Sequence, residues 1–304
     1  MSTEHPSQTC LLLILPPLFW AGNSVLARGI ADQIPPVTLA FWRWALALII
    51  LLPFTWRQLC QDWPEIKRGW KQIAVLGLLG IASFNTLLYT AAHTTTALNI
   101  ALTQALMPVV IVLMSYVLFG DGIHRRQAVA ITLCLLGAGY VVIQGNPQRL
   151  MSMQYVTGDL LMLLAVCLYA LYSVLLRTRP AVHPMSFLTS TFTVGVVLLL
   201  PLYLWETQTT AGWVLSSSVV TSLLYVALFP SILAYLCWNR GIHEIGANRA
   251  GLYINLIPLF AALLAILLLG EHFQSYHLVA GSLIVSGLLL FNLPVAKKSR
   301  ELAP

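Results

Sequence analysis

One apolar segment occurs twice in the chain. Residues 96–121 read TALNIALTQALMPVVIVLMSYVLFGD, and residues 246–271 read GANRAGLYINLIPLFAALLAILLLGE. The offset is 150 residues, and it places Pro258 on Pro108. Similarity at a fixed spacing of this size indicates that the chain contains two copies of one unit. Each copy is long enough to cross a bilayer and is broken near its middle by a proline.

The composition excludes a soluble globular protein. Hydrophobic residues make up 59% of the 304 residues and charged residues 9%, whereas a typical soluble domain has about 25% charged residues. One core could not bury so much apolar surface, so the chain belongs in a membrane. The apolar runs are continuous rather than alternating, which favours α-helices over the strands of a barrel.

Ten segments are predicted to span the membrane, since each crossing takes about 20 helical residues. They are 11–29, 36–54, 73–92, 97–119, 126–145, 157–176, 184–204, 216–238, 247–269 and 275–294. The first is read as a retained helix, because MSTEHPSQTC lacks the basic region of a signal peptide.

The basic residues predict the orientation. Thirteen of the 16 Lys and Arg residues lie in the connections on the side of the N-terminus, and Arg28 and Arg149 lie on the other side. Basic connections stay in the cytoplasm, so both termini are predicted to be cytoplasmic. The same rule explains the net charge of +6 without a nucleic-acid partner.

The duplication extends over the whole chain. SVLAR at 24–28 matches SVLLR at 173–177, and Pro36 and Pro53 match Pro184 and Pro201. Residues 1–150 and 151–304 are therefore predicted to form one five-helix repeat each. Because five is odd, the second repeat enters the membrane from the opposite side. The predicted fold is an all-α integral membrane protein with ten transmembrane helices, arranged as two inverted five-helix repeats around a central cavity.

Polar and aromatic side chains recur at matching depths in the two repeats. They lie one helical turn apart and so share a helix face within each span. The candidate binding residues are Trp20, Asn23, Asn85 and Tyr89 in the first repeat and Tyr169, Tyr172, Tyr235 and Asn239 in the second. A single buried Asn often only joins two helices. A symmetric set with interleaved aromatic residues favours a lined cavity on a substrate path.

Pro108 and Pro258 are candidate gating positions. Each removes an amide from its helix and crowds the carbonyl one turn earlier, which frees the carbonyls of Gln104 and Ile254. A freed carbonyl in a membrane needs water, a neighbouring helix or a substrate as its partner. Gln104 and Asn255 lie at these breaks and join the candidate binding residues. The alternative is that the prolines only kink the helices for packing.

Two charged residues have candidate roles. Arg43 is the only basic residue well inside a predicted span. It could balance a substrate carboxylate, but we favour a side chain that reaches outward between Trp42 and Trp44 or bonds loop carbonyls. Asp159 opens the sixth span and is the first candidate for proton coupling, although no acidic residue lies at mid-span.

No metal site and no cofactor is predicted. The five cysteines form no CxxC pair, and there is no GxxxxGK[ST] loop for ATP. The segment HEIGA at 243–247 lacks the second histidine of the zinc-protease motif HExxH. A membrane enzyme is therefore disfavoured. A channel is disfavoured too, because neither rings of like charge nor a glycine-rich filter is present.

Several stretches resemble a known family. FNTLLYTAAHTTTALNIALTQALMPVVIVLMSYVLFGD at 84–121 and AYLCWNRGIHEIGANRAGLYINLIPLFAALLAILLLGE at 234–271 are similar to the two repeats of the EamA-type branch of the drug/metabolite transporter (DMT) superfamily. GDLLMLLAVCLYALYSVLLR at 158–177 and the arginine of AFWRWALAL resemble it as well. One departure is Asp121, where the family more commonly has Glu, as at Glu271.

The resemblance implies a ten-helix transporter of the bacterial inner membrane, with spans 1, 3, 4, 6, 8 and 9 around the cavity. Known members move amino acids, other small metabolites or cationic drugs, mostly outward. We therefore predict a secondary transporter that exports small amphipathic metabolites by alternating access. An importer or exchanger on the same fold is the alternative. The expected partners are a small-molecule substrate and the lipid bilayer, with the protein as a monomer or homodimer.

Overall fold

The computed structural model describes residues 9, 11–30, 33–95, 97–151, 156–210, 212–269 and 272–293, and no strand occurs among them. The α-helices are α2 (Leu15–Gly29), α3 (Pro36–Arg68), α4 (Trp70–Gly77), α5 (Phe84–Ala92), α6 (Ala97–Ala105), α7 (Met107–Phe119), α8 (Arg125–Val142), α9 (Gln148–Met151), α10 (Thr157–Leu175), α11 (Pro184–Thr209), α12 (Ser217–Ala227), α13 (Ala234–Ile245), α14 (Ala247–Leu252), α15 (Leu256–Leu269) and α16 (Ser275–Asn292). Four short helices of other types connect them: η1 (Leu78–Ser83), η2 (Leu176–Thr178), η3 (Leu228–Leu233) and η4 (Tyr253–Asn255).

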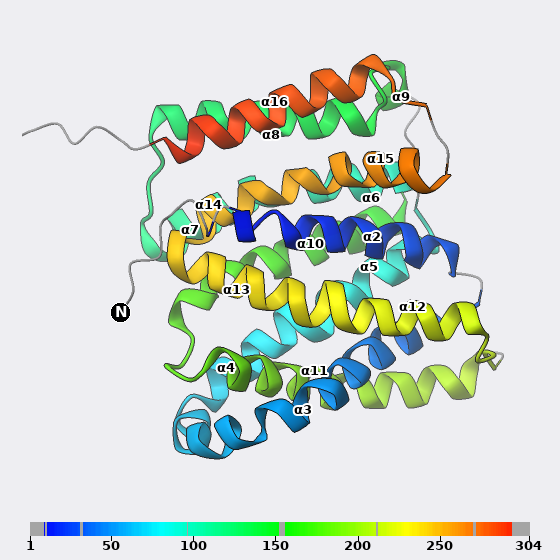
Figure 1. The fold of residues 1–304 in the computed structure, drawn as a ribbon, viewed down its shortest axis with the longest axis vertical. Helices are drawn as coiled ribbons and strands as arrows, with labels where there is room; N and C mark the ends of the chain where they lie inside the picture. The colour runs from blue at the N-terminus through cyan, green and yellow to red at the C-terminus, as the bar shows by residue number, and fades with distance from the viewer. Residues whose placement is uncertain are drawn as a thin grey trace, which may run out of the picture.

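The described residues bear out the all-helical membrane class. Eight helical stretches among them are long and apolar enough to cross a membrane. Two predicted spans fall outside that set: α2, which has 15 residues, and α8, which begins with Arg125 and Arg126. In Figure 1 both helices lie alongside the longer ones.

The helix that contains the second predicted span extends well beyond that span. Hydropathy ends it at residue 54, but α3 continues to Arg68 and contains 33 residues, with Pro53 and Pro64 inside it. A helix of this length is about 50 Å long, whereas the hydrocarbon core is about 30 Å thick. Apolar character marks where the membrane ends, and the helix continues beyond that point as a polar extension.

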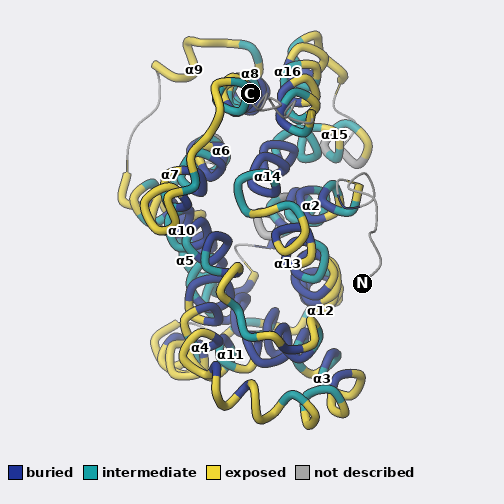
Figure 2. Tube along the Cα trace, turned by 90° about the vertical axis from the view of Figure 1, so that its left-hand side faces the viewer, coloured by how far each residue is buried: buried dark blue, intermediate teal, exposed yellow. Residues whose placement is uncertain are grey.

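The helices form two layers. Figure 2 looks along them and shows α5, α6, α7 and α10 in one layer and α2, α12, α13 and α15 in the other. Contacts between α8 and α16 join the layers at one edge, and contacts between α3 and α11 join them at the opposite edge. Four connections lie at the same end of the molecule, on the left in Figure 1: α3–α4, α7–α8, α10–α11 and α13–α14.

The packing repeats at the offset of the sequence repeat. Helix α2 packs against α15, and its counterpart α10 packs against α6 and α7. The second helices of the two halves, α3 and α11, pack on each other, as do the last helices, α8 and α16. The helix breaks repeat too. Pro108 lies in the first turn of α7, after the break at Leu106, and Pro258 lies in the first turn of α15, after η4. A proline is tolerated there because the first turn needs no amide partner.

One π-helix interrupts the third span of each half. The two are η1 (Leu78–Ser83) and η3 (Leu228–Leu233), and their starting residues are 150 positions apart. A π-helix widens one turn and loosens the regular bonding of the backbone, and such elements are frequent at functional sites. This feature has no counterpart in the hydrophobic pattern from which the spans are predicted.

Helices α3 and α11 cap each other. Glu206 of α11 is buried and accepts bonds from the Val37 amide at 3.1 Å and from the Thr38 amide and hydroxyl at 2.6 and 2.8 Å. At the other end of the pair, Asp62 of α3 accepts a bond of 2.9 Å from the His183 amide, just before α11 begins. Helix N-termini leave amides unpaired and favour negative charge, so each carboxylate stabilises the start of the neighbouring helix.

Replacing Glu206 by Gln is expected to lower the melting temperature of the purified protein by several degrees. The change removes the charge from hydrogen bonds that are worth about 1.5–3 kcal/mol when charge-assisted. The control is Glu65→Gln, which removes an exposed pair with Arg68 and is expected to change little, because such pairs contribute about 0–1 kcal/mol. Equal melting temperatures for the two variants would contradict the capping role of Glu206.

Candidate functional site

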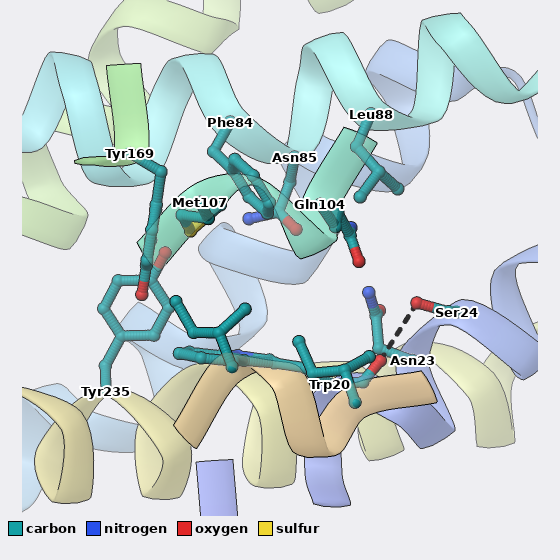
Figure 3. A pocket seen from close by; sticks show the side chains of 12 residues that line it. Trp20, Asn23, Ser24, Phe84, Asn85, Leu88, Gln104, Met107, Tyr169 and Tyr235 are labelled. Atoms are coloured by element: carbon teal, nitrogen blue, oxygen red, sulfur yellow. Dashed lines mark hydrogen bonds between the residues drawn. The ribbon is translucent and has the colours of Figure 1, made fainter. Parts of the chain in front are cut away.

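A small cavity lies between the two layers (Figure 3). Its volume is about 30 Å³. Its lining residues come from both halves of the chain and are Trp20, Asn23, Ser24, Phe84, Asn85, Leu88, Gln104, Met107, Tyr169, Tyr235, Ile254 and Ile257. A cavity of this size holds about one or two water molecules. Any metabolite would therefore require the surrounding helices to separate.

The helix breaks border this cavity. Gln104 and Met107 flank the break between α6 and α7, and Ile254 and Ile257 flank the break between η4 and α15. The two predicted gating prolines, Pro108 and Pro258, follow these residues directly in sequence.

Of the ten candidate binding residues, six line the cavity: Trp20, Asn23, Asn85, Gln104, Tyr169 and Tyr235. Three others lie behind this lining. The Tyr172 hydroxyl donates to Asn239 Oδ1 at 2.8 Å, and the Tyr89 hydroxyl donates to Asn23 Oδ1 at 2.9 Å. Asn255 is fully buried in η4, outside the lining, and neither atom of its amide has a hydrogen-bond partner among the described residues. The cavity therefore has a lining layer and a supporting layer of predicted residues.

Arg43 points into the molecule, so the favoured interpretation of an outward-reaching side chain is wrong. Its side chain is 1% exposed, and its guanidinium lies 4.8 Å from the centre of the Trp44 ring. Its guanidinium donates to five acceptors, three of which share the two hydrogens of Nη1. The acceptors are Ser231 Oγ at 2.7 Å, Asn23 Oδ1 at 3.1 Å, Asn85 Oδ1 at 2.9 Å, Tyr89 Oη at 2.9 Å and the Pro230 carbonyl at 3.0 Å. Arg43 thus joins the cavity wall of the first half to η3 of the second.

The two π-helices supply backbone acceptors at equivalent positions. The Gly80 carbonyl of η1 accepts a bond of 2.5 Å from the Tyr235 hydroxyl. The Pro230 carbonyl of η3 accepts from Arg43 and, at 3.1 Å, from Trp20 Nε1. Gly80 and Pro230 are related by the 150-residue offset. In each half, then, the distorted turn accepts a bond from a side chain of the other half.

An aromatic cluster closes one side of the cavity. The rings of Trp20 and Tyr169 meet edge to face at 5.8 Å, and the centroids of Trp20 and Trp238 are 5.4 Å apart. Tyr169 also contacts Tyr172 at 5.3 Å. Edge-to-face and tilted ring pairs of this kind are favourable beyond the apolar area they bury. The packed rings form an apolar wall on this side of the cavity.

Asp159 lies apart from the cavity lining, at the start of α10. Its two carboxylate oxygens each accept a bond of 3.0 Å from Asn99 Nδ2, and Oδ2 accepts one of 2.9 Å from the Val156 amide. The Thr95 hydroxyl donates to it as well. These contacts hold the α5–α6 connection against α10. The carboxylate is placed to stabilise a helix N-terminus.

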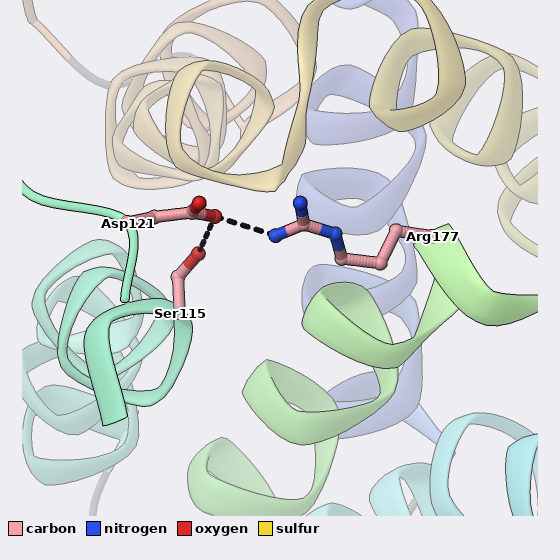
Figure 4. Close-up of polar contacts among 3 residues, drawn as sticks. All are labelled: Ser115, Asp121 and Arg177. Atoms are coloured by element: carbon pink, nitrogen blue, oxygen red, sulfur yellow. Dashed lines mark hydrogen bonds and ion pairs between the residues drawn. The ribbon is translucent and has the colours of Figure 1, made fainter. Parts of the chain in front are cut away.

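Asp121 joins the two halves at the end of the molecule where the α7–α8 connection lies (Figure 4). Its Oδ2 accepts bonds from the Ser115 hydroxyl at 2.7 Å and from Arg177 Nη1 at 2.6 Å. The bond from Ser115 and the nearby positive charge of Arg177 hold the pKa of Asp121 below its usual range, while partial desolvation opposes them. The corresponding Glu271 lies outside the described residues.

Sequence reasoning missed part of the site. Ser231 and the Pro230 carbonyl complete the Arg43 contacts, and a proline within an apolar span is the sequence feature that could have indicated them. The apolar lining residues Phe84, Leu88 and Met107 carry no pattern that separates them from core residues. Among the residues that the structure describes, no group of three or more His, Cys, Asp and Glu side chains could hold a metal ion.

Comparison with known proteins identifies the family. The pattern described as the EamA-like transporter family matches residues 7–143 and again residues 156–293. The chain belongs to the EamA-like transporter family. The resemblance seen in the sequence is confirmed, and the double match follows the internal duplication. EamA members are transporters, which agrees with the apolar helices of a multi-pass membrane protein.

Relatives and a solved structure extend the comparison. The EamA chain is 27% identical to the "Uncharacterized transporter YyaM" of Bacillus subtilis over 276 residues, covering 90% of this chain and 89% of the relative. It is 25% identical to the "Probable terminal-alkyne amino-acid exporter" of Streptantibioticus cattleyicolor over 238 residues, 77% of each chain. A crystal structure with 18% identity covers 94% of this chain and 97% of its own, with a TM-score of 0.76, and supports the fold.

Proposed function

We propose that this EamA-family protein is a secondary transporter that exports small amphipathic metabolites, such as amino acids, related compounds or drugs, by alternating access. In this proposal residues 1–150 and 151–304 are two inverted five-helix repeats that rock about the central cavity. The protein lies in a bacterial inner membrane as a monomer or homodimer, with both termini cytoplasmic. The same machinery run inward or as an exchanger is the alternative.

The observation that carries the proposal is the cavity at the junction of the two halves. Residues from both halves line it, and the paired helix breaks border it. Broken helices that meet near the middle of a membrane protein are typical of secondary transporters. The connections that carry most of the basic residues gather at one end, which supports the proposed orientation. The relative named as an amino-acid exporter supports outward transport of amino-acid-like compounds.

The test is export by whole cells. Cells that express the protein are compared with empty-vector cells for resistance to toxic analogues of amino acids and to cationic drugs, and for efflux of the radiolabelled compounds. The wild-type protein is expected to raise resistance to at least one class and to speed its efflux. If no compound is moved faster than in empty-vector cells, in either direction, the transporter proposal fails.

Replacing Asn85 by Ala is expected to cut this export by about tenfold or more while the protein stays folded. Asn85 lines the cavity and also accepts a bond from Arg43, and loss of one well-placed polar contact costs about 1–3 kcal/mol, where 1.4 kcal/mol is tenfold. Asn146→Ala in an exposed connection is the matched control and should export normally. Export by the Asn85 variant at the wild-type rate would remove this residue from the site.

A further inference from the structure

Arg43 is a buried cation whose hydrogen-bond partners are all uncharged. Its acceptors in the described part of the chain are two amide oxygens, two hydroxyl oxygens and one backbone carbonyl. A guanidinium stays charged inside proteins. Holding it within a membrane-spanning helix is costly, and such residues as a rule have a functional partner. The positive charge at the cavity therefore lacks a counter-charge among these acceptors.

The contacts of Arg43 fix the orientation of two amides of the cavity wall. An arginine only donates, so Asn23 and Asn85 must turn Oδ1 toward it. The Tyr89 hydroxyl donates to the same oxygen of Asn23 at 2.9 Å, which fixes that amide a second time. The two nitrogens are consequently turned away from Arg43. In Figure 3 the nitrogen of Asn23 points into the cavity, toward Gln104.

The cavity wall thus carries the amide nitrogen of Asn23, which faces the cavity, and that of Asn85, which lies toward the hydroxyl of Tyr235 in the same lining; the positive charge of Arg43 lies behind both amides. The remaining lining is aromatic and aliphatic, with Phe84, Leu88 and Ile257 among its members, and contains no acidic side chain. Donors backed by a cation match an acceptor group that carries negative charge, since hydrogen bonds to ionised acceptors are the stronger ones. The apolar wall matches a hydrocarbon or aromatic body attached to that group.

We infer that the cavity binds the carboxylate of a small apolar or aromatic carboxylate, with Asn23 and Asn85 donating to it and Arg43 acting behind them as a positioning residue and counter-charge. The inference rests on the proposed transport function and names the substrate class of the same site. Because the cavity holds about 30 Å³, the ligand body is accommodated when the two halves move apart. Asn23 on α2 and Asn85 on α5 then remain as the anchor for its head group.

The first experiment ranks three ligands of one shape on the purified wild-type protein. They are phenylacetate, its uncharged amide phenylacetamide, and phenethylammonium. Binding is measured by calorimetry and by the rise in melting temperature that a ligand of the folded state produces. Phenylacetate is expected to bind at least about tenfold more tightly than the other two, because a charge-assisted bond exceeds a neutral one by at least that factor. Equal binding of the three, preference for the cation, or no binding of phenylacetate at millimolar concentration overturns the inference.

The second experiment changes the donors. Asn85→Asp keeps the size and the oxygen facing Arg43, but it replaces the donor group by a carboxylate oxygen and neutralises the guanidinium. Phenylacetate affinity is expected to fall at least about tenfold, since like charges now face each other. The matched control is Asn146→Asp, which adds the same charge to an exposed connection and should bind as wild type. A folded Asn85→Asp protein that keeps its phenylacetate affinity contradicts the inference.

Two readouts keep the inference separate from the proposed function. If Asn85→Asp does not fold, Asn23→Asp makes the same change on α2, and the wild-type ranking decides by itself. If the cells export cationic compounds while phenylacetate does not bind, the transporter stands and the carboxylate subsite is wrong. If nothing is transported but phenylacetate binds in the expected order, the subsite stands and the transport proposal fails.

Discussion

Replacement of Arg43 by Leu is expected to reduce transport by about 100-fold while the protein remains folded. The variant loses five hydrogen bonds around the cavity. Bonds between membrane helices contribute about 0.6 kcal/mol each, so about 3 kcal/mol of stabilisation is lost. Removing the buried charge stabilises the inserted protein by about 2.5–3.5 kcal/mol, the cost of a charged residue at the centre of a membrane helix on the insertion scale. The two terms nearly cancel, so the melting temperature should change little. The amides of the cavity wall lose their fixed orientation, so export should fall by about 100-fold, a change in rate that corresponds to a barrier raised by about 2.7 kcal/mol.

Arg43→Lys separates this account from a purely structural one. Lysine keeps the cost of a buried cation, but its single ammonium cannot reach five acceptors spread over α2, α5 and η3. The conservative variant is therefore expected to melt at a lower temperature than Arg43→Leu, and to transport poorly as well. Melting curves in detergent and efflux from intact cells measure the two effects. A stable, active lysine variant beside an unfolded leucine variant would show that charge alone matters at this position.

Replacement of Gly80 by Ala is expected to destabilise the protein and slow transport. A Cβ atom at Gly80 would lie 2.5–2.7 Å from three ring atoms of Tyr172, which has no exposed surface. Such overpacking typically costs about 1–3 kcal/mol. The Tyr172 ring would have to move, which breaks its bond to Asn239 and disturbs the η1 carbonyl that Tyr235 uses.

Gly139→Ala is the matched control for Gly80→Ala. Gly139 lies inside α8, and a Cβ atom there meets nothing within 4 Å. Alanine is favoured over glycine in a helix by about 1 kcal/mol, so this variant should melt at the same temperature or slightly higher. If both variants have the wild-type melting temperature and transport rate, the close contact between η1 and α10 is unimportant.

The sequence repeat predicts much of the site because it reports depth along each span. Residues at the same depth in the two halves, such as Asn85 and Tyr235, do meet at the cavity. Depth does not give the rotation of a helix about its own axis. The direction of Arg43 depends on that rotation and on a carbonyl released by η3, and neither leaves a mark in hydropathy. The same limit explains Asn255, which has the predicted depth but lies outside the cavity lining.

The sequence predicts which helices are present better than it predicts where each helix ends. The polar extension of α3 to Arg68 places Asp62 at the start of α11, where it accepts a bond from the His183 amide. That contact joins two residues 121 positions apart in the sequence, so no local sequence pattern predicts it. The prolines at 108 and 258 do predict their helix breaks, because loss of an amide is a local effect.

The π-helices also record the history of the chain. A π-turn contains about one residue more than an α-turn, so one inserted residue is enough to turn a regular helix into such an element. Two separate insertions at positions 150 residues apart would require a coincidence of register, whereas one insertion before the gene was duplicated explains both. The matching positions are thus what a widened turn already present in the unit before duplication would leave. The two copies diverged afterwards in what they donate to it: a tyrosine hydroxyl at Gly80, and a guanidinium and an indole at Pro230.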